Sequence, residues 1–211
     1  MVTMKSPTPE PEQQAANSAR VSLEILSDEG LMLRVGDGNQ LAYQTLVGRH
    51  LGPSLGMATR VLANAAEAEE IMQEAFLRLW RHAPNWSPQG AKFTTWFYRV
   101  VMNLCIDRQR TRRATMVPIE VAGDPADDRQ GADSQLHESQ VGDQVAQAIA
   151  TLPERQRAAI TLCYLQGLSN KEAAEILDVN IKALESLLTR GRRALKDQLS
   201  PLKDELMGFE Q

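Results

Sequence analysis

Hydrophobic residues recur with the spacing of α-helices in two separate blocks of this chain, residues 27–114 and 141–200. In the first block Ile71, Ala75 and Leu79 fall on one side of a helix, with Met72 and Phe76 nearby, as expected where one helical face is buried. No segment of any length alternates apolar and polar residues with the period of a β-strand. The pattern therefore predicts an all-α protein with two small helical domains.

The segments outside these blocks are predicted to form two tails and a linker. Residues 1–26 are rich in Pro, Gln, Ser and Ala and predict a disordered N-terminal tail, and residues 201–211 are expected to form a C-terminal tail. Residues 115–140 contain Glu120, Asp124, Asp127, Asp128, Asp133 and Glu138 against Arg129. This composition predicts a flexible acidic linker between the two domains.

Several residues mark the expected ends of helices. The spacing of a capping box occurs at Asn64 and Glu67, at Thr151 and Glu154, and at Ser169 and Glu172. Gly52 and Pro53 lie inside a helical pattern that spans residues 40–62. Because an interior proline removes a hydrogen bond and crowds the preceding turn, we expect this helix to break or kink there.

Residues 168–196 have the pattern of a helix-turn-helix. A short helix after Ser169 is followed by a tight turn at residues 178–180 and by a longer helix that Asn180 can cap. Asp178 stands where such a turn usually has glycine, and aspartate tolerates the left-handed conformation better than most residues. The apolar stripe of the long helix is Ile181, Leu184, Leu188, Gly191 and Leu195, and its polar face carries Lys182, Glu185, Ser186, Thr189, Arg190, Arg193 and Lys196. That face can bind base edges and phosphates, although an ordinary helical hairpin with a solvated face is the alternative.

Residues 93–113 form a helix with two different faces. The core face is Phe93, Phe97, Val100, Val101 and Leu104, and a separate stripe carries Trp96, Arg99, Asn103, Asp107 and Arg110. Arginine binds phosphates, asparagine binds base edges, and an aromatic ring stacks on an unpaired base. The stripe therefore indicates a nucleic-acid surface, in which residues 84–92 could wrap a base taken out of its stack. The alternative is a core tryptophan and a solvated basic helix end.

The helix over residues 65–86 has an acidic and amide-rich face opposite its apolar stripe. This face contains Glu67, Glu70, Gln73 and Glu74. It is either simply solvated or a docking face for a basic partner surface.

Composition limits the classes of function. The net charge of −4 over 211 residues argues against indiscriminate nucleic-acid binding but not against local basic patches. We expect Cys105 and Cys163 to be reduced, buried thiols. The three histidines, His50, His82 and His137, show no metal-ligand spacing, and no signal peptide or membrane-length apolar run is present. We therefore expect a soluble, cytoplasmic protein with no enzymatic activity, metal, cofactor or small-molecule substrate.

Three motifs in this order resemble the extracytoplasmic-function (ECF) sigma factors of bacterial RNA polymerase, over roughly residues 28–199. The motifs are AEEIMQEAFLRLW, FTTWFYRVVMNLCIDRQRTRR and LPERQRAAITLCYLQGLSNKEAAEILDVN. The resemblance implies that residues 27–114 form a domain that docks on core polymerase and melts the −10 element. It also implies that residues 141–200 form a helix-turn-helix domain that reads the −35 element.

The resemblance also assigns individual residues. It implies core-polymerase contacts by Glu70, Gln73, Glu74, Phe76 and Trp80. It places Trp96, Arg99, Val100, Asn103, Arg110, Arg112 and Arg113 at the −10 element, and Lys182, Ser186, Thr189, Arg190 and Arg193 at the −35 element. Residues 183–187 depart from the usual run of the family, and Glu185 there either accepts a hydrogen bond from cytosine or repels phosphate.

The implied function is promoter-specific initiation of transcription together with core RNA polymerase and promoter DNA, under the control of an anti-sigma factor. Two other classes of function remain open at this point. One is a regulator that binds an operator without polymerase, and the other is a helical adaptor that never contacts DNA.

Overall fold

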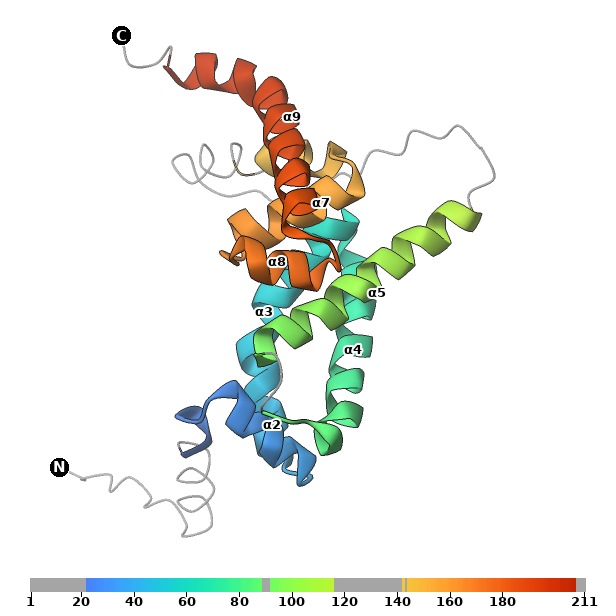
Figure 1. The fold of residues 1–211 in the computed structure, drawn as a ribbon, viewed down its shortest axis with the longest axis vertical. Coiled ribbons are helices and arrows are strands. Elements are labelled where there is room, and N and C mark those ends of the chain that lie inside the picture. Colours follow the sequence, from blue (N-terminus) through green and yellow to red (C-terminus); the bar gives the residue numbers. More distant parts are fainter. Residues whose placement is uncertain (1–21, 89–91, 116–141, 143, 208–211) are drawn as a thin grey trace, which may run out of the picture.

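The computed structural model describes residues 22–88, 92–115, 142 and 144–207, and Figure 1 shows the helices that they form. The first domain contains α2 (Asp28–Gly36), α3 (Gln40–Leu62), α4 (Ala65–His82), the 3-10 turn η1 (Ala83–Asn85) and α5 (Phe93–Thr115). The second contains helical residues 144–151, α7 (Glu154–Ile160), the π-helical turn η2 (Thr161–Leu165), α8 (Asn170–Ile176) and α9 (Ile181–Met207). These described residues contain no β-strand, so the expected all-α fold is confirmed.

The first domain is organised around the apolar faces of its four α-helices. Its largest fully buried side chains are Leu31, Met32, Leu46, Met57, Leu79, Phe93, Phe97 and Met102. Phe93 and Phe97, on successive turns of α5, stack with ring centroids 5.6 Å apart. The predicted apolar stripe of α4 is confirmed, because Ile71, Ala75 and Leu79 are all buried.

The second domain contains the predicted helix-turn-helix, formed by α8 and α9. Leu184 and Leu188 of α9 are buried, whereas Ile181, the first residue of the stripe, is 48% exposed. Asp178 has φ of +51°, so it adopts the left-handed conformation that the turn requires. Asn180 caps α9, because its Oδ1 accepts the Ala183 N–H at 2.8 Å.

The predicted helix caps agree with the structure at two of three sites. Ser169 and Glu172 form a complete capping box at α8, and Asn64 Oδ1 accepts the Glu67 N–H at 3.1 Å. The expectation for Thr151 was wrong. Its hydroxyl donates to the carbonyl of Ala148 in the preceding helix, so it does not cap α7.

The proline at position 53 does not break α3, so of the break or kink that we expected, the break is wrong. The helix is continuous over its 23 residues. Leu46 and Met57 are fully buried on either side of the proline, and this burial outweighs the single backbone hydrogen bond that a proline lacks.

The ends of the two domains also differ from the predicted limits. Residues 22–26, expected in the N-terminal tail, pack on α3, because Leu23 is buried and the Arg49 guanidinium donates to the Leu26 carbonyl at 2.9 Å. At the other end α9 continues to Met207, beyond residue 200. The linker expected at residues 115–140 and the remainder of both tails lie almost wholly outside the described residues.

The second domain packs directly on the first, with α8 against α5 and with α7 and η2 against α3 (Figure 1). The Val61 carbonyl, in the last turn of α3, accepts hydrogen bonds from Gln109 Nε2 of α5 at 2.7 Å and from Arg157 Nη1 of α7 at 3.0 Å. Beside Val61 a hollow of about 70 Å³ lies between the domains, lined in part by Ile106 and Leu187. The interface is therefore incompletely packed.

Gly191 lets α9 approach α7 closely. A Cβ atom at this position would lie 2.9 Å from Ile160 Cγ1. We therefore expect Gly191→Ala to lower the free energy of unfolding by about 1–3 kcal/mol, measured by urea denaturation. Gly48 is the matched control, because it lies within α3 with open space around it. There alanine should stabilise the protein by up to about 1 kcal/mol, and effects of equal sign at both sites would contradict this prediction.

Candidate nucleic-acid and polymerase interfaces

An aromatic cluster supports Trp96 at the start of α5. Trp96 is half-buried and stacks on His82 at the end of α4, with ring centroids 4.9 Å apart and planes at 19°. Trp86 packs edge-on against Trp96 at 5.5 Å. The indole therefore lies at the surface of the domain, but it is held in place by rings from two other elements.

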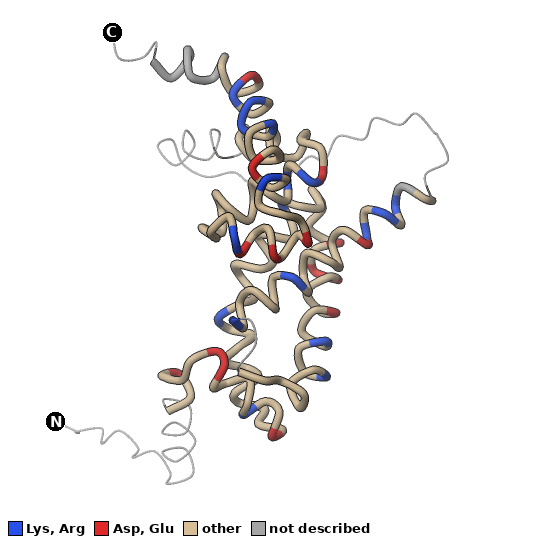
Figure 2. Tube along the Cα trace, in the orientation of Figure 1, with Lys and Arg blue, Asp and Glu red and all other residues tan. Residues whose placement is uncertain are grey.

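The rest of the predicted −10 stripe continues along α5 from Trp96. Asn103, Arg110 and Arg112 are exposed, and Val100 is half-buried against the core. The side chain of Arg113 lies outside the described residues. Figure 1 shows the C-terminal part of α5 projecting from the body of the protein, and Figure 2 shows Lys and Arg along that part.

Helix α8 lies against this stripe at Arg99. The Arg99 guanidinium donates to the Glu175 carbonyl at 2.8 Å and to the Glu175 carboxylate at 3.1 Å. Lys92 Nζ lies 3.4 Å from Glu172 Oε1, also on α8. Two acidic side chains of the second domain thus lie beside two cations of the first, on the side where the prediction placed DNA.

The residues of α4 that were assigned to polymerase lie at the surface or half-buried, with one exception. Glu70 and Gln73 are exposed, and Trp80 is 38% exposed with its ring edge-on to Tyr43 at 5.2 Å. Arg108 of α5 binds Glu70 through both terminal nitrogens at 2.9 Å, and Glu74 pairs with Arg78 one turn away at 2.8 Å.

The exception is Phe76, which was expected among the contacts to polymerase. It is 6% exposed and packs against Phe97, with ring centroids 5.1 Å apart. Its ring belongs to the apolar stripe of α4, so it supports the helix from inside the domain.

The polar face of α9 is exposed from Lys182 to Arg193. Lys182, Ser186, Thr189, Arg190 and Arg193 are all exposed, and the first four line a shallow hollow together with Glu185. Ser186 Oγ donates to the Lys182 carbonyl, and Arg190 Nε donates to the Ser186 carbonyl. In the part of the chain that is described, this candidate −35 face is not covered by the first domain, unlike the stripe on α5.

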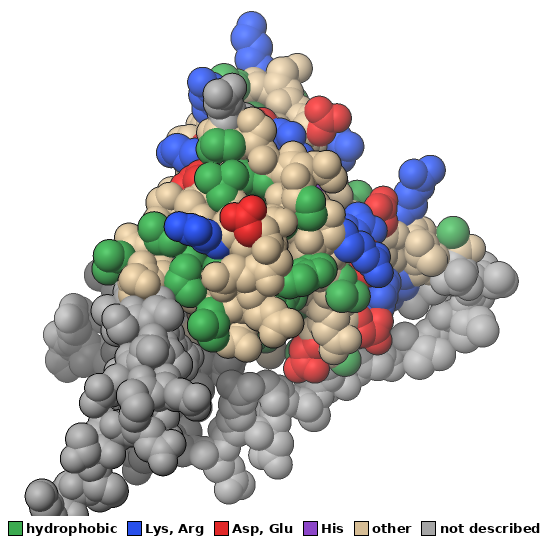
Figure 3. Space-filling view, turned by 90° about the horizontal axis from the view of Figure 1, so that it is seen from below, with side chains coloured by type: hydrophobic (Ala, Val, Ile, Leu, Met, Phe, Trp, Pro, Cys, Tyr) green, Lys and Arg blue, Asp and Glu red, His purple; other side chains and the backbone are tan. Residues whose placement is uncertain are grey.

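Hydrophobic side chains on the face seen in Figure 3 form small separate groups, with Lys and Arg side chains on both sides of them. Within the described ranges no helix is long and apolar enough to cross a membrane. Cys105 is buried, and burial raises the pKa of its thiol to about 12. Cys163 is only half-buried, which differs from the expectation.

Comparison with known proteins assigns the family. The family model described as "Sigma-70 region 2" matches residues 46–115, and "Sigma-70, region 4" matches residues 142–195. The ECF RNA polymerase sigma factor SigE of Mycolicibacterium smegmatis is 33% identical over 85% of this chain and 72% of its own length. SigW of Bacillus subtilis is 34% identical over 80% of this chain and 95% of its own length.

The chain is an ECF sigma factor. Proteins of this family direct the initiation of transcription by RNA polymerase and are not enzymes. Among solved structures, CnrH in complex with the cytosolic domain of CnrY aligns with this sigma factor at a TM-score of 0.61 and 25% identity. The alignment covers 82% of this chain and 97% of CnrH. The sigma factor RpoE of Bartonella quintana, in complex with the anti-sigma factor NepR, shares the fold at a TM-score of 0.57, with 21% identity over 75% of this chain and 96% of RpoE.

The region 2 match begins inside α3, so it leaves α2 of this sigma factor outside. The sequence pattern likewise assigns no role to α2 and does not indicate that Lys92 and the acids of α8 meet. The contacts of Lys92, Glu172 and Glu175 arise only where α8 packs on the first domain, and the sequence does not predict that packing.

Proposed function

We propose that this sigma factor, once bound to core polymerase, reads the −10 element with α5 and the −35 element with α9. The observation that carries the proposal is the exposed polar stripe of α5, where Asn103 and Arg110 continue the line of the supported indole of Trp96. These three side chains supply a base-edge contact, a phosphate contact and a surface for stacking. Arg99 lies on the same stripe, and the proposal also assigns Val100, Arg112 and Arg113 to the −10 surface.

For the −35 element the proposal uses the polar face of α9. The residues assigned are Lys182, Ser186, Thr189, Arg190 and Arg193. A helix in this position of a helix-turn-helix enters the major groove, where such side chains contact bases and phosphates.

Docking on core polymerase is assigned to α4. The proposal places Glu70, Gln73, Glu74 and Trp80 against a basic surface of polymerase, with the indole as the apolar contact. Phe76 takes no part, because it is buried.

Promoter melting then requires no hydrolysis. A base that leaves the duplex can be captured against Trp96, and its capture offsets an unstacking free energy of a few kcal/mol. Because core polymerase holds both domains on one body, each weak DNA contact raises the effective concentration of the other.

The packing of α8 on α5 also bears on this mechanism. Since Arg99 is held by Glu175, we propose that the sigma factor without polymerase keeps its −10 surface partly covered and that the domains separate before DNA is read.

Reversing the charge of Glu175 tests this cover. We expect Glu175→Lys to raise the affinity of the polymerase-free protein for single-stranded −10 DNA about three- to fivefold, because an exposed ion pair contributes up to about 1 kcal/mol. Fluorescence anisotropy measures this affinity. Glu69→Lys, which makes the same change of net charge on the exposed face of α4, is the matched control. An equal gain in both variants would show that only net charge matters.

We further propose an anti-sigma factor as a partner of this chain. The proposal is supported by the similarity to CnrH, which was solved with the cytosolic domain of CnrY, and by the packed arrangement of the two domains. A partner that binds both domains at once would keep α8 on α5.

Multi-round transcription with purified core polymerase and a pooled genomic fragment library tests the proposed function. Discrete transcripts that require this protein would support it, and their aligned start sites would reveal both promoter elements. Specific retention of fragments without polymerase, and no transcripts, would instead support a stand-alone regulator.

A further inference from the structure

The helix α5 lacks a capping side chain at its own start. Its first backbone hydrogen bond runs from the Trp96 N–H to the Lys92 carbonyl at 3.1 Å, which places Lys92 at the N-cap position. Lysine has no acceptor with which to bind the free N–H groups of the first turn. The start of the helix therefore needs an acceptor from elsewhere.

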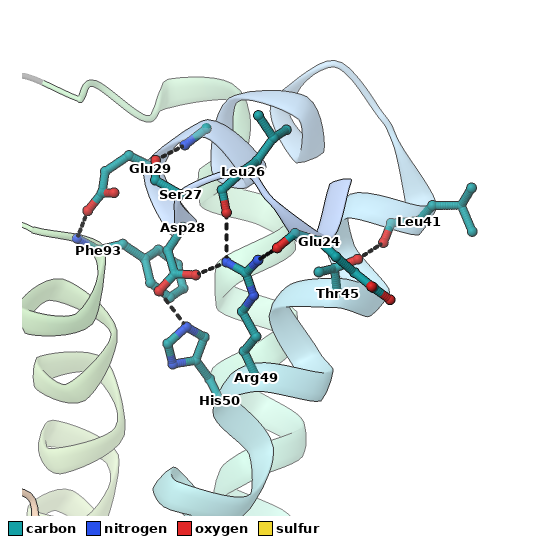
Figure 4. A network of polar contacts seen from close by, with 11 residues as sticks. Glu24, Leu26, Ser27, Asp28, Glu29, Leu41, Thr45, Arg49, His50 and Phe93 are labelled. Carbon is teal, nitrogen blue, oxygen red and sulfur yellow. Dashed lines mark hydrogen bonds and ion pairs between the residues drawn. The ribbon is translucent and has the colours of Figure 1, made fainter. Parts of the chain in front are cut away.

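That acceptor comes from α2, 64 residues earlier in the chain. Glu29 Oε1 accepts the N–H of Phe93, the first residue of α5, at 3.1 Å (Figure 4). Glu29 is half-buried, and a negative charge is favourable at the positive end of a helix dipole. The bond joins α5 to α2 at a fixed point.

The neighbouring residue Asp28 fixes Glu29 in turn. The Asp28 carboxylate accepts from Arg49 Nη1 and lies against His50 Nε2, each at 2.8 Å, so the first turn of α2 is held on α3 (Figure 4). Burial alone would raise the pKa of Asp28, but the hydrogen bonds from His50 and Arg49 bring it below its ordinary value of 3.8. The stabilisation is therefore complete at neutral pH and is lost only as the pH falls from about 4 through this lowered pKa.

The same network reaches the buried side of α5. The His50 ring lies 5.0 Å from the ring of Phe93 and 6.1 Å from that of Phe97. The first turn of α5 is thus held in two ways: Glu29 binds the backbone N–H of Phe93, and the His50 ring packs near the rings of Phe93 and Phe97. Trp96 belongs to this turn, so its indole moves with any shift of the helix start.

We infer that Glu29 is a positioning residue for the −10 element: its hydrogen bond to the Phe93 N–H fixes the start of α5 and thereby the position of Trp96. The inference rests on the proposed role of α5 in promoter opening. It assigns to α2, which lies outside both family matches, a part in initiation that needs no contact with DNA.

The test compares the rate of promoter opening with the affinity for core polymerase. Opening is followed by 2-aminopurine fluorescence at the −10 element of a promoter found by the transcription experiment. We expect Glu29→Ala to slow opening about fivefold, the size expected for the loss of one helix cap, with core affinity unchanged. Glu29→Gln keeps an acceptor oxygen and should retain most of the rate. Glu24→Ala, which removes an exposed carboxylate from the same segment, is the matched control and should change neither quantity.

A second variant separates positioning from simple stabilisation of the helix. In Glu29→Ala with Lys92→Ser, the new serine supplies a local N-cap, so the thermal midpoint should return toward that of the natural protein. Opening should stay slow, because α5 is no longer bonded to α2, and Lys92→Ser alone shows what the lost lysine contributes. If opening recovers together with the thermal midpoint, or if Glu29→Ala opens at the natural rate, the inference is wrong. Asn103→Ala is run in parallel. If both Asn103→Ala and Glu29→Ala open the promoter at the rate of the natural protein, the proposed role of α5 itself is wrong.

Discussion

Asn103→Ala is expected to slow promoter opening tenfold or more while core polymerase binds the variant with unchanged affinity. Asn103 is exposed on the stripe of α5 that begins at Trp96, and a specific contact from a side chain to a base is worth about 1–3 kcal/mol. Opening can be measured by permanganate reactivity of the −10 thymines, and core affinity by fluorescence anisotropy of a labelled sigma factor.

Asp107→Asn is the matched control for this prediction. Asp107 lies one turn further along the same stripe and is also exposed, but a carboxylate there does not favour phosphate. The substitution should leave opening unchanged or raise it. If Asn103→Ala lowers core affinity as much as it lowers opening, Asn103 does not read the promoter.

The second large effect is expected at the other interface. Trp80→Ala should weaken binding to core polymerase about tenfold or more, because an exposed tryptophan at the centre of an interface is commonly among its few dominant contacts. The indole is 38% exposed on the same helix as Glu70 and Gln73. Titration of labelled sigma factor with core polymerase measures the change in affinity. At saturating polymerase the rate of promoter opening should equal that of the natural protein.

Trp80 also packs on Tyr43, so its loss can affect folding. Trp80→Phe keeps an aromatic ring against Tyr43 and should preserve the thermal midpoint while recovering only part of the affinity. A lower thermal midpoint with natural affinity for polymerase in Trp80→Ala would show that the indole only supports the fold.

Local features of the fold could be predicted from the sequence because their causes lie within a few residues. The two faces of α5 followed from helical periodicity, and Phe93 and Phe97 are indeed fully buried. The left-handed turn at Asp178 and the cap at Asn180 followed from the chemistry of those side chains. The local rule for proline left a break or a kink open at Pro53, and tertiary burial keeps the helix unbroken there.

Features that join distant parts of the chain had no signal in the sequence. Arg99 and Glu175 are 76 residues apart, and their charges alone do not indicate that they meet. The bond from Glu29 to the backbone of Phe93 likewise joins distant residues. The residues around Glu29 in the sequence do not indicate that its carboxylate reaches the start of α5. Phe76 is a different case. Helical periodicity places it beside the buried stripe of α4, whereas the family resemblance assigned it to polymerase, and its burial agrees with the periodicity.

The shared acceptor at Val61 has a consequence for how readily the two domains part. When α7 withdraws, the Val61 carbonyl loses Arg157 but keeps Gln109, so no buried acceptor is stranded. The departing guanidinium regains water, and burial had lowered the pKa of Arg157, which means that its charge is better solvated outside the interface. The interface between the domains can thus separate without a large free-energy barrier from unpaired polar groups. The two domains should therefore separate and reassociate far faster than either domain unfolds.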